Sequence, residues 1–161
     1  MSTTDLDKLK QSLLARNIKY LLPTYVDMHG VPKTKMVPIA HLKRMMAGSE
    51  LFTGAALDGV PQDVSDEEVA AHPDPASCMI VPWRDDCAWF SSDLWTEGKP
   101  FEPCNRGILK KVLKQAADMG YRVNCGIEAE FYVFADNERK VDPLSPLPHL
   151  EKPAYDAVRL M

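Results

Sequence analysis

Two glutamates separated by a single residue are the side chains of this sequence best suited to chemistry. Glu128 and Glu130 lie in the apolar stretch 121–134, whose length and composition predict a strand. Side chains two residues apart on a strand share a face, so the two carboxylates would lie about 7 Å apart. Like charges held that close resist burial unless a cation neutralises them. Because carboxylate oxygens are the ligands that Mg²⁺ and Mn²⁺ prefer, the pair predicts a site for one or two divalent ions.

The alternative is that both glutamates simply face solvent on a half-exposed strand. Tyr132 and Phe134 weaken this alternative, because they would share that solvated face. Zinc chemistry is not indicated, since the cysteines and histidines are scattered and lack the close pairs that zinc sites use. We expect reduced, mostly buried thiols and assign no chemistry to the histidines. These residues are Cys78, Cys87, Cys104, Cys125, His29, His41, His72 and His149.

Composition excludes several classes of protein. The chain has 161 residues, enough for one large domain or two small ones, and its 45% hydrophobic and 26% charged residues are ordinary for a globular protein. A net charge of −4 argues against a nucleic-acid-binding surface. No apolar run approaches the ~20 residues of a membrane span. The polar start is unlike a secretory signal or a transit peptide, so we expect a soluble, cytoplasmic protein with no nucleic-acid or membrane partner.

The N-terminal region predicts a helix, a β-hairpin and a short second helix from its hydrophobic spacing and turn residues. The hairpin contains Pro23, which suggests an edge strand or a bulge. Gly48 suits the left-handed residue that ends a helix. The ranges are 3–17 for the first helix, 18–27 and 33–39 for the strands, and 41–47 for the second helix.

The middle of the chain, from 54 to 76, predicts an irregular segment, because glycines, prolines and a cluster of acidic residues interrupt it. Two more strands are predicted, joined by a polar turn at 84–86. We place a domain boundary near residue 100, since the helix, strand and loop that follow it cannot close a second core. The ranges are 77–83 and 87–93 for the strands and 105–119 for the helix after the boundary, with Asn105 as its cap.

Five segments in order resemble the glutamine synthetase family. The segment Gly126-x-Glu128-x-Glu130-Phe131-Tyr132-x-Phe134 resembles the first metal-binding strand of that family. Two of the others resemble the hairpin of its N-terminal β-grasp domain and the loop that reaches a neighbouring subunit's active site. The four earlier segments are Val26-Asp27-x-x-Gly30 with Lys33, Lys35 and Val37-Pro38; Phe52-x-Gly54 with Ser65-Asp66-x-x-Val69 and Pro73-Asp74; Ile80-Val81-Pro82-Trp83; and Cys104-Asn105-Arg106-Gly107-Ile108-Leu109.

The resemblance implies an α+β fold, with an N-terminal β-grasp domain over residues 1–100. Residues 101–161 would begin a catalytic α+β domain of the glutamine synthetase type, supplying its first helix and strand. The implied activity is that of an ATP-dependent ligase. The γ-carboxylate of glutamate takes the γ-phosphoryl group of ATP, and an amine, either ammonia or a small alkylamine, then attacks the γ-glutamyl phosphate.

The resemblance also implies site residues and partners. Two Mg²⁺ or Mn²⁺ ions in each complete site would clamp the phosphates, with Glu130 on the ion near glutamate and Glu128 on the ion near ATP. Asp66 matches the second acidic position of the loop donated to a neighbouring subunit, and Glu68 is the alternative. The substrates would be glutamate, ATP and an amine, and identical subunits would form stacked hexameric rings.

The sequence departs from the family at residues 53–56. Thr53-Gly54-Ala55-Ala56 stands where members that use ammonia usually carry Asp-Gly-Ser-Ser. Thr53 cannot replace the charge of the aspartate that helps to bind and deprotonate ammonium, and the smaller side chains could favour a bulkier amine. The sequence therefore looks closer to the branch of γ-glutamylmethylamide synthetases and type III glutamine synthetases.

Two alternatives remain open at this stage. The acidic residues at 63–68 could form a solvated loop without a role in catalysis. The chain could also be a stand-alone β-grasp module that binds a partner or joins subunits, in which case Glu128 and Glu130 would have no role. No residue of this chain matches the family's remaining ligands for metal, ATP and glutamate. We therefore expect this chain alone to be inactive.

Overall fold

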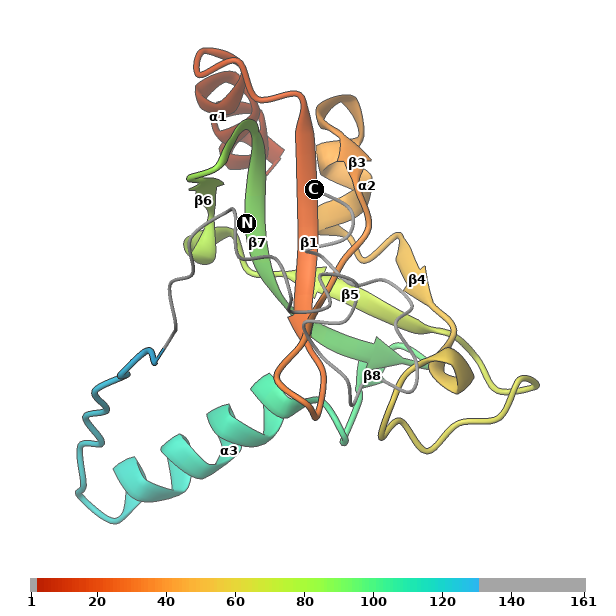
Figure 1. The fold of residues 1–161 in the computed structure, drawn as a ribbon, viewed down its shortest axis with the longest axis vertical. Coiled ribbons are helices and arrows are strands. Elements are labelled where there is room, and N and C mark those ends of the chain that lie inside the picture. Colours follow the sequence, from red (N-terminus) through yellow and green to blue (C-terminus); the bar gives the residue numbers. More distant parts are fainter. Residues whose placement is uncertain (1–2, 131–161) are drawn as a thin grey trace, which may run out of the picture.

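The computed structural model describes residues 3–130, which build a curled, mixed sheet with helices at its ends (Figure 1). The strands run in the order β2-β1-β7-β5-β4, and β3, β6 and β8 attach to this path. The strands are β1 (Tyr20–Val26), β2 (Pro32–Lys33), β3 (Val37–Pro38), β4 (Glu50–Phe52), β5 (Val69–Pro73), β6 (Met79–Val81), β7 (Arg84–Thr96) and β8 (Lys99–Pro100). The helical elements are α1 (Thr3–Leu14), η1 (Ile39–His41), α2 (Leu42–Met46), η2 (Gly54–Ala56), η3 (Pro75–Ser77) and α3 (Asn105–Asp118).

Strand β7 organises the sheet because its 13 residues are long enough to pair with neighbours over two separate halves. Its first half pairs in parallel with β1 and antiparallel with β6, and its second half pairs antiparallel with β5 and β8. Helices α1 and α2 lie at one end of the sheet, and α3 extends from the other end (Figure 1). The sheet therefore separates the first two helices from the third.

Two main hydrophobic clusters stabilise these two ends. The first packs α1 and α2 against β1 and β7, and the second fills the space between β1, β4, β5 and the end of β7. Fully buried aromatic side chains lie in both, Phe90 in the first and Phe52 in the second. The first cluster contains Leu13, Ile18, Leu21, Val37, Leu42, Met45, Ala88 and Phe90. The second contains Tyr25, Phe52, Leu57, Val69, Ala71, Leu94, Phe101 and Cys104.

The predicted N-terminal hairpin is confirmed, but its first strand is not at an edge. Strand β1 lies between β7 on one side and β2 and β3 on the other. The ladder on the hairpin side is interrupted at Pro23, because β3 pairs with the start of β1 and β2 pairs with its end. The Pro23 carbonyl accepts a hydrogen bond from the Thr34 hydroxyl at 3.0 Å. The proline therefore lies where its missing N–H removes no ladder bond.

A buried ion pair lies beneath the hairpin turn. The Lys33 ammonium is 3.6 Å from the Asp27 carboxylate, and the two side chains are 0% and 1% exposed. The other carboxylate oxygen of Asp27 accepts hydrogen bonds from the backbone N–H groups of His29 and Val31, each at 2.9 Å. The pair thus fixes the turn to the strand that follows it. The sequence predicts both residues in the hairpin, but no local pattern indicates their burial.

Two expectations for the middle of the chain are wrong. The segment 54–76 is not wholly irregular, because it contains β5, whose alternate residues are buried between β4 and β7. The turn between β6 and β7 lies at Pro82 and Trp83 rather than at 84–86. Residues 84–86 instead begin β7, which the sequence analysis started at Cys87.

The C-terminal expectations have mixed outcomes. Helix α3 confirms the helix predicted over 105–119, but its cap residue is Cys104, since the Asn105 side chain donates to the carbonyls of Val26 and Asp27. The strand predicted over 121–134 is wrong for 121–130, which are exposed and form no strand; 131–134 lie outside the described residues. A strand needs a ladder partner for its backbone groups, and no described strand pairs with this segment. Within 3–130, no helix is both long and apolar enough to cross a membrane.

Gly48 is expected to accept a side chain only at a cost in stability. Its φ is +83°, and an added Cβ would lie 2.3 Å from Nε2 of His72. Gly48→Ala should therefore lower the free energy of unfolding by about 2 kcal/mol or more, through left-handed strain and overpacking together. Gly30→Ala is the matched control, because Gly30 has φ +80° with no atom within 4 Å of an added Cβ. Equal losses for the two variants in urea denaturation would show that the contact with His72 is unimportant.

Candidate functional site

The structure places Glu128 and Glu130 on an exposed segment that follows α3. Their carboxylates are hard oxygen donors open to solvent, which suits a divalent cation. Within 3–130, no group of three or more His, Cys, Asp or Glu side chains is arranged to hold a metal ion. These two glutamates therefore form at most part of a ligand set, and the described residues do not supply the rest.

The acidic loop between η2 and β5 projects from the β4 edge of the sheet (Figure 1). The Asp66 carboxylate accepts a hydrogen bond from the backbone N–H of Asp63 at 2.8 Å, which closes a turn near the tip. Glu68 lies immediately before β5, and its carboxylate accepts from the Thr53 hydroxyl at 2.8 Å. The Gln62 amide donates to the carbonyl of Glu67 at 2.9 Å. The loop is thus held in shape by internal bonds while both predicted carboxylates, Asp66 and Glu68, stay exposed.

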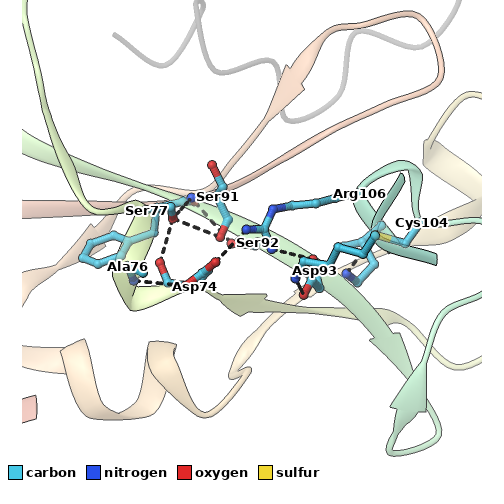
Figure 2. Close-up of polar contacts among 11 residues, drawn as sticks. Asp74, Ala76, Ser77, Ser91, Ser92, Asp93, Cys104 and Arg106 are labelled. Carbon is cyan, nitrogen blue, oxygen red and sulfur yellow. Dashed lines mark hydrogen bonds and ion pairs between the residues drawn. The ribbon is translucent and has the colours of Figure 1, made fainter. Parts of the chain in front are cut away.

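A polar network joins the start of α3 to the sheet (Figure 2). The Arg106 guanidinium lies between two aspartates, with Nη2 at 2.6 Å from Asp74 and Nη1 at 2.8 Å from Asp93. Lys110, one helical turn later, places its Nζ 2.5 Å from the other carboxylate oxygen of Asp93. The side chains of Arg106, Asp93 and Asp74 are only partly exposed. The accessible fraction is 29% for Arg106 and for Asp93, and 32% for Asp74.

A second set of hydrogen bonds holds Asp74 itself in place. Its carboxylate accepts from the backbone N–H of Ala76 at 3.0 Å, which caps η3. The Ser77 hydroxyl donates to the Asp74 carbonyl at 2.7 Å and accepts from the backbone N–H of Ser91 at 2.8 Å (Figure 2). These bonds connect Asp74 to β7 independently of its contact with Arg106.

The network keeps its charges over a wide pH range. The hydrogen bond from Arg106 is the main reason that the pKa of Asp74 lies below its ordinary value. Burial alone would raise the pKa of Asp93, but hydrogen bonds from Lys110 and Arg106 outweigh it and lower that pKa. Burial likewise opposes the charge of Arg106, yet the two aspartates raise its pKa. Near neutral pH the network is therefore a set of fully charged, directional hydrogen bonds.

The sequence analysis did not foresee this network. The sequence assigns no contact to either Arg106 or Lys110. The partners are 13 and 32 residues away in the sequence, so no local spacing indicates them. The segment 104–109 gave the available indication of a role for Arg106, because it places an arginine in the first turn of a helix that leaves the sheet.

Comparison with known proteins identifies relatives over most of the chain. The family model described as glutamine synthetase, catalytic domain, matches residues 102–157. A glutamate–methylamine ligase of Methyloversatilis universalis is 36% identical over 148 residues, covering 91% of this chain and 34% of the relative. A glutamine synthetase of Rhizobium meliloti is 31% identical over 148 residues, covering 91% of this chain and 33% of the relative. This chain thus spans about a third of the length of these curated relatives.

Two further relatives extend the comparison. A γ-glutamylanilide synthase of an Acinetobacter species is 31% identical over 163 residues, covering 86% of this chain and 32% of the relative. A solved structure titled as a GmaS complex with ADP superposes with a TM-score of 0.65 and 31% identity, covering 69% of this chain and 26% of that one. The match therefore holds both for the sequence and for the arrangement of the curled sheet.

Proposed function

Since this chain belongs to the glutamine synthetase family, we propose that it is the N-terminal part of an ATP-dependent ligase that joins an amine to the γ-carboxylate of glutamate. The observation that carries the proposal is the 36% identity with a glutamate–methylamine ligase over 148 residues. In this function, the γ-carboxylate attacks the γ-phosphorus of ATP and ADP leaves. The amine then attacks the acyl phosphate and displaces inorganic phosphate, which leaves a γ-glutamyl amide.

The chain would supply part of the metal site and part of the amine site. Glu130 would hold the ion near glutamate and Glu128 the ion near ATP, and both carboxylates are exposed hard donors in the structure. Bound Mg²⁺ or Mn²⁺ would neutralise the charge that develops on the phosphates. The remaining ligands would come from residues outside the described range.

The organisation of the chain supports two further parts of the proposal. The family model of the catalytic domain begins at residue 102, close to the boundary predicted near 100, so residues 1–100 would form the β-grasp domain. The acidic loop projects from the sheet with its carboxylates exposed, as a loop offered to a neighbouring subunit would. We therefore propose a cytoplasmic homo-oligomer of stacked hexameric rings in which adjacent subunits share each site.

Amine choice is proposed from residues 53–56. Thr53 carries no charge, and its hydroxyl is engaged with Glu68. One relative is named for the ligation of methylamine and another for the synthesis of a γ-glutamylanilide, which supports an amine larger than ammonia. The relative kcat/KM values for ammonia, methylamine and larger amines would test this choice.

The charge of the loop carboxylate can be tested without disturbing the loop. Asp66→Asn keeps an oxygen that accepts from the Asp63 N–H, and Glu68→Gln keeps one that accepts from Thr53. If Asp66 is the residue offered to the amine, Asp66→Asn should lower kcat/KM for the amine by about 10²-fold, as for loss of one acid–base group. Glu67→Gln is the matched control on the same exposed loop. Loss of activity in Glu68→Gln alone would assign the role to Glu68, and full activity in both variants would exclude the loop.

The proposal itself is tested by ADP release from the complete protein that contains this chain. Release should require glutamate, an amine and Mg²⁺ or Mn²⁺ together, and omission of any one should abolish it. The intact mass of the natively expressed protein provides the accompanying check. A native product that ends at Met161 and releases no ADP would support the stand-alone module instead.

A further inference from the structure

Helix α3 is held to the sheet almost entirely by polar contacts at its first two turns. None of its 14 residues is buried, so hydrophobic packing within the described residues does little to fix its direction. The hydrogen bonds that join it to the sheet come from Asn105, Arg106 and Lys110. Within residues 3–130, the direction of the helix therefore depends on a few polar and charged side chains.

Arg106 contacts two different parts of the sheet with one rigid group. Asp74 directly follows β5, the strand that begins where the acidic loop ends, whereas Asp93 lies within β7. A guanidinium is planar, so bonds from two of its nitrogens to separate carboxylates fix its orientation as well as its position. Lys110 adds a second fixed point one turn further along the same helix face.

The network also crosses the proposed domain boundary. Asp74 and Asp93 precede residue 102, where the catalytic-domain match begins, while Arg106 and Lys110 follow it. One guanidinium thus connects the strand after the acidic loop with the helix that leads to Glu128 and Glu130. These are the two segments to which the proposed function assigns site residues.

Small rotations of α3 would be strongly amplified at its far end. At 1.5 Å per residue, its 14 residues form a lever of about 21 Å, so a 10° rotation about Cys104 moves the end by about 4 Å. Catalytic geometry is sensitive to displacements of about 1 Å. A loosely oriented α3 would therefore misplace the segment that carries the two glutamates.

We propose that Arg106 is a positioning residue, which clamps α3 to β5 and β7 and thereby sets the place of Glu128 and Glu130 relative to the acidic loop. Its effect on catalysis rests on the proposed ligase function, whereas the clamp itself is a property of the described residues. Arg106 touches no reacting atom in this account. It acts through the direction of the helix.

The first test is kinetic and uses the complete protein. Arg106→Gln should lower kcat by about tenfold or more and raise the half-saturating Mn²⁺ concentration. Arg106→Lys, which bonds one carboxylate but cannot span both, should give an intermediate result. Lys114→Gln is the matched control, because Lys114 lies on the same helix and its ion pair within residues 3–130 is with the exposed Asp118. The proposal would be overturned if Arg106→Gln lowered only the thermal stability and the fraction of active protein, while the half-saturating Mn²⁺ concentration stayed unchanged.

The second test is independent of activity. Spin labels at the exposed positions Ala76 and Gln115, with Cys78 and Cys125 replaced, report the distance between η3 and α3. Arg106→Gln should broaden the distance distribution and Lys114→Gln should not; identical distributions would overturn the clamp. If the unmodified complete protein ligates no amine, the proposed function fails while this measurement still decides the clamp.

Discussion

If the proposed ligase function holds, replacing Glu130 by glutamine in the complete protein is expected to lower kcat by about 10²- to 10³-fold at saturating Mn²⁺. The substitution keeps the size of the side chain but removes the charge that would hold the ion near glutamate. Metal ions contribute several kcal/mol of charge stabilisation to phosphoryl transfer, and each 1.36 kcal/mol is worth a factor of ten in rate. The same variant should reduce the rise in melting temperature that Mn²⁺ produces, and so should Glu128→Ala, because each removes a ligand of one of the two proposed ions.

The matched control for this experiment is Glu102→Gln. Glu102 is an exposed glutamate within the region matched by the catalytic-domain model, and nothing assigns it to the site. Its variant should retain both activity and the stabilisation by Mn²⁺. Full activity of Glu130→Gln would exclude this residue as a metal ligand, and an unchanged thermal shift in both variants would remove the metal assignment of the pair.

Replacing Lys33 by methionine is expected to lower the free energy of unfolding by about 3 to 5 kcal/mol. Methionine is similar in volume but leaves the buried carboxylate of Asp27 without the cation that now lies 3.6 Å away. An uncompensated buried charge is costly, because the low-dielectric interior cannot replace the hydration it has lost. Urea denaturation of the 161-residue chain, with the unfolding slope compared between variants, measures the loss.

Two further variants separate the charge from the packing at this site. Asp27→Asn combined with Lys33→Met removes both charges and should recover much of the lost stability. Lys114→Met removes one partner of an exposed pair, with side chains 74% and 62% accessible, and should cost less than about 1 kcal/mol. If Lys33→Met costs no more than this control, the buried pair does not stabilise the hairpin.

Local patterns predicted the elements in which apolar residues recur at regular spacing along the sequence. The helices and the hairpin were predicted from apolar spacing, and Gly48 was correctly placed at the end of α2 with a positive φ. Strand β5 was missed, because its sequence carries no strong local signal and its place between β4 and β7 is set by tertiary pairing. The edge strand suggested by Pro23 is wrong for a similar reason, since the gap between β2 and β3 that accommodates the proline is a tertiary feature.

The candidate site was predictable only in part. The spacing of Glu128 and Glu130 predicts a metal-binding pair, and the loop motif predicts Asp66, with Glu68 as the alternative; these assignments stay predictions. The predicted strand around the glutamates does not form over 121–130, because a lone strand has no partner for its backbone groups. The contacts of Arg106 could not be foreseen, since its aspartate partners are brought to it by the pairing of β5 with β7.

The central claim is that the complete protein forms an amide bond between glutamate and an amine at the expense of ATP. The most direct measurement is mass spectrometry of the product after incubation with glutamate, ATP, Mn²⁺ and isotopically labelled methylamine or ammonium. The expected product is a γ-glutamyl amide that carries the label, formed in proportion to the ADP released. Glutamate recovered unlabelled with every amine, whether or not ATP is consumed, would contradict it.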